Sequence, residues 1–256
     1  MQLVKDLYQS QWRDDDLQAN IRRSLASGLP EFVPTFIKHD GLFVIVGSGP
    51  SLPQFIEEIR QEKASGRPII SMNGAHDFLI ENGIIPDVFM TVDPRPMPQN
   101  LKHINDETYY LIASRVGDDT FDRLKGRKVI LWHAYSESDE IELLNGKFVV
   151  TGGTTTGLRA FCFGYCMGFR RFRAYGMDSC FHGEQKHYKA DKNGPMPKMM
   201  DIHVGGKSFY TNYAMASQAK EFQNLYNQLP GITIEIMGDG LLAAILEERK
   251  RLGMPC

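Results

Sequence analysis

The feature that most constrains the fold is an alternation of short apolar runs with amphipathic stretches, which begins at residue 42. Helical patterns cover residues 52–63, 75–81, 155–167 and 212–228. The apolar runs predict strands over 42–46, 69–72, 88–92, 109–113, 128–132, 148–150, 172–175 and 232–236. Strands that alternate with helices pair in parallel through right-handed crossovers. We therefore expect an α/β fold with a doubly wound, mostly parallel sheet.

Two stretches depart from this alternation. Residues 1–40 have helical, polar character and end in the glycine- and proline-containing "SGLPEFVPTF", so they predict a helical extension before a main domain over 41–256. Residues 177–210 are rich in glycine, lysine, histidine and proline and have little periodicity. A stretch of that kind in a compact domain predicts a lid-like loop, which we expect to close when donor or acceptor binds.

Composition and charge narrow the classes of partner. The 256 residues carry a formal net charge of −2, so overall basicity indicates neither a nucleic-acid nor an anionic-membrane partner. The four cysteines have neither zinc-ligand spacing nor the density of a disulfide scaffold. There is no signal-peptide pattern and no apolar run long enough to span a membrane. We expect a cytoplasmic protein that binds small molecules; a homo-oligomer is compatible with this reading.

The stretch "GLFVIVGSGPSL" runs an apolar strand into a small-residue turn. Ser51 and Gln54 fit a capping box, and Gly47 and Gly49 allow a sharp turn with room for a ligand near free helix amides. There is neither a P-loop Gly-Lys-Ser/Thr nor the third glycine of the dinucleotide motif. Two interpretations stay open: a phosphate site or a plain strand–turn–helix corner.

Polar residues also follow two further predicted strands. Asn73-Gly74 comes directly after 69–72, and Asp93 comes directly after 88–92. Because ligands in parallel sheets lie beyond the carboxyl ends of the strands, these residues should share one edge with Gly47. Asn73 could bind a base or ribose, and Asp93 a ribose hydroxyl or Mg²⁺. The alternative for Asp93 is a turn-forming residue before Pro94.

A third group occurs in "VVTGGTTTGLRAFCFGYCMGFRRFRAYGMDSCF". Thr155, Thr156 and Gly157 begin a predicted helix, where hydroxyls and free amides suit a second phosphate or a carboxylate. Threonines are also ordinary helix N-caps. The strand at 172–175 then brings Asp178 to the same edge.

Three blocks of the chain resemble the core blocks of the MptE-like proteins: "VGSGPSL", "NGAHDFLIENGIIPDVFMTVDP" and "TGGTTTGLRAFCFGYCMGFRRFRAYGMD". That family is named for the archaeal 6-hydroxymethyl-7,8-dihydropterin diphosphokinase. It includes motility-associated factors that glycosylate flagellin and is similar in fold to bacterial CMP-sialic-acid-dependent sialyltransferases. The resemblance covers residues 42–178, so it implies nothing about the acceptor.

The resemblance implies a Rossmann-like sheet that binds a nucleotide donor, either ATP with Mg²⁺ or a CMP-sugar. Asn73, Gly74 and Asp93 would meet nucleoside or metal, and Thr155, Thr156 and Gly157 would close the donor site. The phosphates would meet Gly47, Ser48, Gly49, Pro50 and Ser51.

Catalytic candidates follow the third block, in "DSCFHGEQKHYKADKNG". The His187-Tyr188 pair resembles the sialyltransferase arrangement, in which a loop histidine acts as base on the acceptor hydroxyl; histidine titrates near neutral pH. Lys186 and Lys189 could neutralise a leaving phosphate. The same stretch, which also holds His182 and Glu184, reads equally as a solvated polar loop.

Three functions follow. The main hypothesis is ATP- and Mg²⁺-dependent diphosphotransfer to a small hydroxylated acceptor, with Asp93 and Asp178 on the metal. The alternative is a CMP-sugar-dependent glycosyltransferase with His187 as base and no obligatory metal. The third is a nucleotide-binding module without chemistry.

Overall fold

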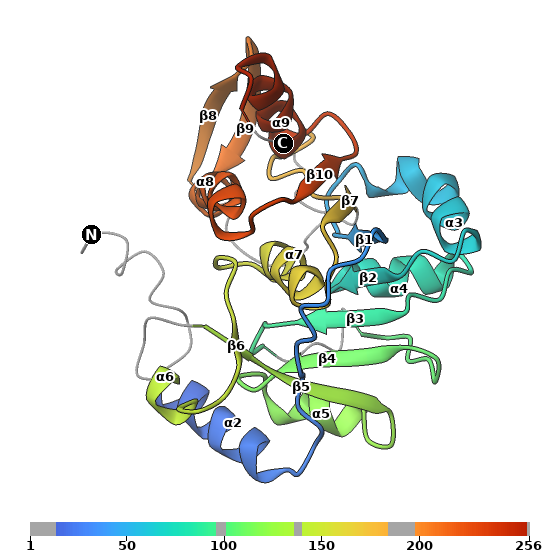
Figure 1. The fold of residues 1–256 in the computed structure, drawn as a ribbon, viewed down its shortest axis with the longest axis vertical. Coiled ribbons are helices and arrows are strands. Elements are labelled where there is room, and N and C mark those ends of the chain that lie inside the picture. The colour runs from blue at the N-terminus through green and yellow to red at the C-terminus, as the bar shows by residue number, and fades with distance from the viewer. Residues whose placement is uncertain (1–13, 96–100, 136–139, 184–197, 255–256) are drawn as a thin grey trace.

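The computed structural model describes residues 14–95, 101–135, 140–183 and 198–254 (Figure 1). Its main sheet consists of β1 (Leu42–Val46), β2 (Ile69–Met72), β3 (Val88–Thr91), β4 (Tyr109–Ala113), β5 (Lys128–Ala134), β6 (Val149–Val150), β7 (Arg171–Tyr175) and β10 (Thr233–Ile236). The strand order is β10-β7-β1-β2-β3-β4-β5-β6, and every neighbouring pair is parallel. The expected doubly wound α/β sheet is confirmed.

The strand order reverses once. The chain steps from β1 to β6 in one direction and then returns to place β7 on the other side of β1, with β10 beyond it. A ligand site in such a sheet lies beyond the carboxyl ends of the strands at this reversal. The fold therefore directs attention to the turns that follow β1 and β7.

Helices cover both faces of the sheet (Figure 1). They are α2 (Asp14–Ala26), the 3-10 helix η1 (Leu52–Phe55), α3 (Ile56–Ala64), α4 (Gly74–Glu81), α5 (Asp118–Arg123), α6 (Glu140–Leu143), α7 (Thr156–Cys166), α8 (Tyr213–Gln228) and α9 (Leu241–Arg251). Side chains of β1 alternate between two cores, as strand geometry requires. Val44 and Val46 pack with residues of α3 and α4, whereas Phe43 and Ile45 join the core that contains α7, α8 and α9.

Part of the expected loop over 177–210 is a β-hairpin. Strands β8 (Met199–Val204) and β9 (Lys207–Asn212) pair antiparallel, and Gly205 and Gly206 between them both have positive φ, 57° and 78°. Two adjacent glycines of that conformation form the two-residue turn that suits the twist of a hairpin. The dipeptide in "DIHVGGKSFYTN" was a signal for this hairpin in the sequence. Residues 184–197 of the same stretch lie outside the described residues.

Of the helical extension expected over residues 1–40, residues 14–26 form α2, a long segment without helix follows, and residues 1–13 lie outside the described residues. Residues 27–41 cross in front of β5, β4 and β3 and lead into β1 (Figure 1). The amide of Phe32 donates to the carbonyl of Leu131 at 2.7 Å, so the segment is tied to β5. Among the helices described, none is long and apolar enough to cross a membrane.

A buried ionic cluster joins α3 to the sheet. Glu62 is 4% exposed, and its carboxylate accepts hydrogen bonds from Arg67, from Arg173 at 2.5 Å and from the Tyr175 hydroxyl at 3.2 Å. Burial raises the pKa of Glu62, but the hydrogen bonds from Arg67 and Arg173 outweigh it, so the pKa lies below its ordinary value. The charged carboxylate is therefore the form that stabilises the fold.

We expect Glu62→Gln to lower the free energy of unfolding by roughly 1–3 kcal/mol, because two guanidinium groups lose a charged acceptor. The lowered pKa means that this stabilisation is present above the ordinary value of 4.5 and is lost as the pH falls through the folded value. Urea unfolding of both proteins across acidic and neutral pH measures the difference. Glu57→Gln is the matched control, because Glu57 pairs with Arg60 at 3.4 Å on an exposed surface. A Glu62→Gln effect no larger than that of the control would contradict the assignment.

Candidate functional site

The turns after β1 and β7 lie against each other at the point where the strand order reverses. The amide of Gly49 donates to the carbonyl of Gly176 at 2.8 Å. A Cβ on Gly47 or on Gly49 would lie 2.6 Å from that same carbonyl oxygen. The sequence suggested that these glycines leave room for a ligand. In the structure, the turn after β7 occupies the space beside their Cα atoms. The glycines are therefore needed for the chain to pack on itself, and phosphate binding by residues 47–51 stays a prediction.

Asp178 lies at the start of the helix that follows β1. Its carboxylate accepts a hydrogen bond from the amide of Ser51 at 3.0 Å, and the residue is 3% exposed. Burial raises the pKa of this carboxyl, while the hydrogen bond from Ser51 favours the charged form. The expected capping box is wrong, because Ser51 has helical φ and ψ and makes no side-chain cap. The Asp178 carboxylate, from the turn after β7, takes the position at this helix start that an anion would otherwise occupy.

Asn73 and Asp93 follow β2 and β3, as expected, and are connected through Thr91. The Thr91 hydroxyl donates to the side-chain oxygen of Asn73 at 3.0 Å and accepts from the amide of Asp93 at 3.2 Å. Asn73 has a φ of 49°, which is uncommon for a residue with a side chain. Gly74 is the first residue of α4. These residues share the carboxyl edge of the sheet with the glycine turns.

Asp93 also acts as a turn-forming residue, which was the alternative to ligand binding that the sequence left open. One carboxylate oxygen accepts from the amide of Arg95 at 3.0 Å, and both oxygens accept from the Arg95 guanidinium. Within the described ranges, no three His, Cys, Asp or Glu side chains are grouped so that they could hold a metal ion. Arg95 occupies both carboxylate oxygens of Asp93, and metal binding there stays a prediction.

The N-terminus of α7 is held by side chains of α8. Thr155 is the N-cap, and its hydroxyl oxygen accepts from the amide of Leu158 at 3.4 Å and from the Gln218 amide at 3.1 Å. The Glu221 carboxylate accepts from both the amide and the hydroxyl of Thr154, at 3.0 Å each. Polar groups thus surround this helix end, and three of the four contacts come from α8, a helix that was not expected to take part.

The remaining part of the third block is buried. Thr156 is 6% exposed, and a Cβ on Gly157 would lie 2.6 Å from the methyl carbon of Met177. Gly157 therefore permits α7 to approach the turn after β7. This contact brings the α7 N-terminus next to Asp178, so the two groups that the sequence predicted separately form one edge.

A further turn reaches the same place from β10. A Cβ on Gly240 would lie 2.7 Å from the Cα of Asp178, so residues 238–240 pack directly on the β7 turn. Asp239 in this turn lies 3.8 Å from the imidazole of His182, measured from Oδ1 to Nε2. Sequence reasoning missed this histidine–carboxylate pair. The signal was "MGDGL", a glycine-rich turn directly after the last predicted strand.

The other loop candidates cannot be placed. Glu184, Lys186, His187, Tyr188 and Lys189 lie outside the described residues. The expectation that His187 acts as a base therefore stays a prediction, as does closure of the segment over the donor.

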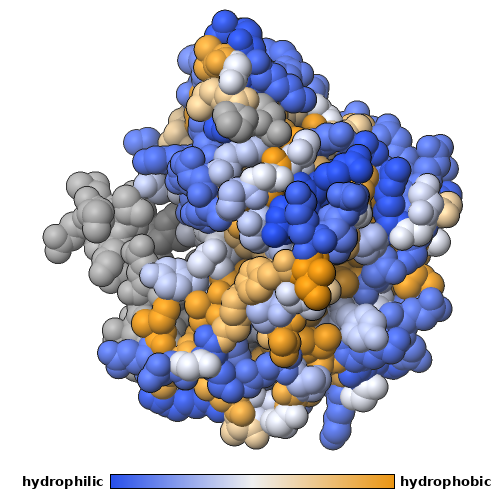
Figure 2. Space-filling view, viewed as in Figure 1, coloured by the Kyte–Doolittle hydropathy of each residue, from blue (hydrophilic) through white to orange (hydrophobic). Residues whose placement is uncertain are grey.

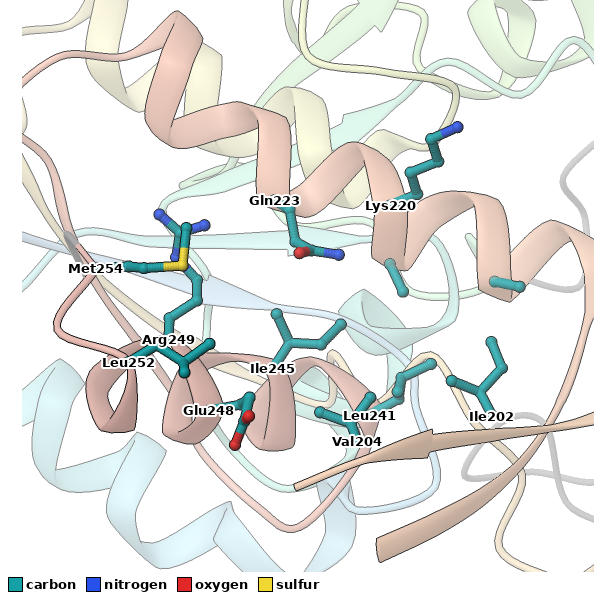
Figure 3. Close-up of a pocket in the computed structure, with 12 residues that line it drawn as sticks. Ile202, Val204, Lys220, Gln223, Leu241, Ile245, Glu248, Arg249, Leu252 and Met254 are labelled. Carbon is teal, nitrogen blue, oxygen red and sulfur yellow. The ribbon is translucent and has the colours of Figure 1, made fainter. Parts of the chain in front are cut away.

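A cavity of about 230 Å³ lies apart from this edge, between the hairpin, α8 and α9 (Figure 3). Its walls are mostly apolar, and Ile202, Leu241 and Ile245 line it. Figure 3 shows the Gln223 amide pointing into it and the Lys220 ammonium pointing away. It lies on the face of α8 opposite Gln218 and Glu221, so it is separate from the candidate donor site.

The turns after β1, β7 and β10 meet at the carboxyl edge of the sheet. The N-terminus of α7 lies at this edge, with the Thr154 amide and hydroxyl bonded to Glu221, and Asp239 lies 3.8 Å from the imidazole of His182. The chain is thus a Rossmann-like α/β protein with its candidate ligand site where the strand order reverses.

The chain belongs to the MptE-like family, since the model for 6-hydroxymethylpterin diphosphokinase MptE-like proteins matches residues 16–184. The expected family is therefore confirmed. No curated protein sequence matches the chain.

One solved structure shares the fold, and two others are more distant matches. The Maf glycosyltransferase from Magnetospirillum magneticum AMB-1 is 18% identical and superimposes with a TM-score of 0.69; the match covers 88% of this chain and 36% of that one. A mammalian sialyltransferase bound to Gal-beta-1-3GalNAc-ortho-nitrophenol is 12% identical, with a TM-score of 0.43 over 88% of this chain and 87% of that one. A second mammalian sialyltransferase structure is 14% identical, with a TM-score of 0.46 over 90% and 82%.

Packing of the two turns predicts a stability effect. We expect Gly49→Ala to lower the free energy of unfolding by about 1–3 kcal/mol, because its Cβ would meet the Gly176 carbonyl and the Asp178 carboxylate. Urea denaturation measures the loss. Gly117→Ala is the comparison, because its nearest neighbour would be the Pro94 carbonyl at 3.2 Å, and its loss should be smaller. Equal stability of Gly49→Ala and the parent protein would show that the two turns do not pack as described.

Proposed function

We propose that the chain catalyses transfer from a nucleotide-activated sugar, with a CMP-sugar as the first donor to test. The supporting observation is the fold that 88% of the chain shares with the Maf glycosyltransferase from Magnetospirillum magneticum AMB-1. The chain spans 36% of the length of that protein, so its acceptor is a separate question. The donor would lie on the carboxyl edge, between the β1 and β7 turns and the N-terminus of α7.

The residues of this edge suit departure of a nucleotide phosphate. In the proposed reaction the acceptor oxygen attacks the anomeric carbon, and the bond from that carbon to the phosphate oxygen breaks with its electron pair leaving on the phosphate. The positive end of α7 and the Thr154 and Thr155 hydroxyls would stabilise that charge. The Glu221 carboxylate accepts the hydrogen bond of the Thr154 amide, so it would have to move for a phosphate to bind there.

The acceptor hydroxyl must lose its proton during the attack. His182 lies beside this edge, with Asp239 3.8 Å from its imidazole, and we propose it as the base that accepts this proton. His187, the candidate from the sequence, is five residues further along the chain. Each is a proposal for the same role, and substitution of each histidine decides between them.

The second candidate function is diphosphotransfer from ATP, which the family description favours. It would place Mg²⁺ on Asp93 and bring the acceptor oxygen to the β-phosphorus of ATP. Arg95 already binds both carboxylate oxygens of Asp93, so this function requires that ion pair to open. We therefore place it second.

The experiment incubates the full chain with a CMP-sugar, CTP or ATP, with Mg²⁺ or with EDTA, and follows donor loss by chromatography. We expect release of CMP from the CMP-sugar, equal in Mg²⁺ and EDTA. His182→Gln should lower kcat about 10²–10⁴-fold with little change in donor affinity, because a base acts on the acceptor. His203→Gln is the matched control, since His203 bonds Ser208 at 2.8 Å within the exposed hairpin.

Three outcomes would change the assignment. Loss of turnover in His187→Gln but not in His182→Gln moves the base to His187 and leaves the reaction unchanged. Mg²⁺-dependent conversion of ATP to AMP would overturn the proposal in favour of diphosphotransfer. Donor binding measured by calorimetry without any turnover would favour a binding module.

A further inference from the structure

The segment that crosses the sheet before β1 carries the most exposed large apolar side chains described. Val33 is 74% exposed and Ile37 is 76% exposed, with Phe36 at 49% between them. Figure 2 shows hydrophobic residues gathered on the lower half of the face that this segment crosses. The segment occupies a place over β3, β4 and β5 that a doubly wound fold ordinarily gives to a helix, so its outer side chains remain uncovered (Figure 1).

The segment is fixed in position by the end of α7. The amides of Thr35 and Phe36 donate to the Cys166 carbonyl at 3.1 and 2.9 Å, and the His39 amide donates to the Gly168 carbonyl at 3.2 Å. A bulky residue at positive φ is an outlier, yet Phe36 has a φ of 53°. That conformation is compatible with an edge-on contact of its ring with Phe148 at 5.9 Å, while its neighbours stay exposed. These contacts hold the side chains of Val33, Phe36 and Ile37, here called the apolar tip, at the surface of the molecule.

Cations border this tip. Lys38 follows Ile37 directly, and Arg170 and Arg171 come from the chain that runs alongside it. Arg170 stacks on Tyr165 at 3.5 Å, and Arg171 donates to the backbone carbonyl of Asp40 at 3.5 Å. Among the described residues, no carboxylate is within ion-pair distance of these three cations, whereas the next arginine on β7 pairs with two glutamates. Asp40 supplies one acidic group in the same stretch, so the local balance remains positive.

We propose that this surface, formed by Val33, Phe36, Ile37, Lys38, Arg170 and Arg171, attaches the protein to an anionic lipid bilayer. Exposed aliphatic and aromatic side chains enter the headgroup region, and adjacent lysine and arginine side chains bind the lipid phosphates. The protein attaches peripherally, through a loop rather than a spanning helix. The formal net charge of −2 does not indicate this surface, because it is a sum over the whole chain.

The charge pattern favours lipid over a second copy of the chain. A two-fold dimer through this surface would bring each cation close to its own copies, and like charges across an interface are unfavourable. A stable protein interface also needs about 800 Å² from each partner, which three protruding apolar side chains do not supply. A bilayer requires no matching groove and accepts a small apolar tip surrounded by cations.

The test is sedimentation of the full chain with vesicles of phosphatidylcholine, with and without phosphatidylglycerol. We expect binding that requires the anionic lipid and weakens in about 0.5 M NaCl, where charges are strongly screened. The double variants Val33→Ser/Ile37→Ser and Lys38→Glu/Arg171→Glu should each reduce the bound fraction roughly fivefold or more. Both should keep the parent melting temperature, because the changed side chains are exposed.

Leu252→Ser/Met254→Ser is the matched control, because these residues are 57% and 45% exposed near the C-terminal end, away from this surface. It should bind vesicles as the parent protein does. Absence of binding to anionic vesicles overturns the proposal. So does a concentration-dependent dimer in light scattering that Val33→Ser/Ile37→Ser abolishes, since the surface would then serve a second copy. Donor turnover is assayed separately without lipid, so failure here leaves the proposed reaction unaffected.

Discussion

The close approach of the turns after β1 and β7 is the constraint on which the rest of the site depends. These strands are neighbours, although Arg171 comes 125 positions after Val46 in the sequence. Their turns meet through glycine, with Gly47 and Gly49 against the Gly176 carbonyl. A Cβ at these positions would push the turns apart and open the edge at the reversal of strand order. The same glycines that resemble a nucleotide motif are therefore also a requirement for closing the sheet.

This packing changes how the glycine turn would serve a ligand. A carboxylate of the chain, Asp178, already accepts from the Ser51 amide, and Glu221 accepts from the Thr154 amide. Both helix starts that the sequence offered to phosphates are thus satisfied by acidic side chains of the protein itself. An anionic donor would compete with them, since two anions repel at such distances. Glu221 is half-buried and on a separate helix, whereas Asp178 is fully buried, so movement at the α7 end is the less costly of the two.

The sequence predicted the sheet well, because short apolar runs bounded by glycine and proline leave little freedom in where a buried strand ends. The bounds of β1, β2 and β4 agree with the predicted ranges, and the turns after β1, β2, β3 and β7 do share one edge. What could not be predicted are contacts between distant segments. Gln218 and Glu221 contact the N-terminus of α7 although more than sixty residues of chain lie between them. Neither hydrophobic periodicity nor a sequence motif indicates such a contact. Glycine-rich turns mark both the hairpin and Asp239 in the sequence, but neither turn indicates which distant residues it contacts.

Helix α7 links the two ends of the molecule that carry proposed functions. Its N-terminus, held by Gln218 and Glu221, lies at the carboxyl edge with the candidate donor site. The carbonyl of Cys166 at its other end holds the segment that displays Val33 and Ile37. Lys38 precedes β1 and Arg171 begins β7, so these cations lie at the amino edge of the sheet. A bilayer bound through these cations and the apolar tip would leave the carboxyl edge open to soluble donors, so attachment and transfer would not exclude each other.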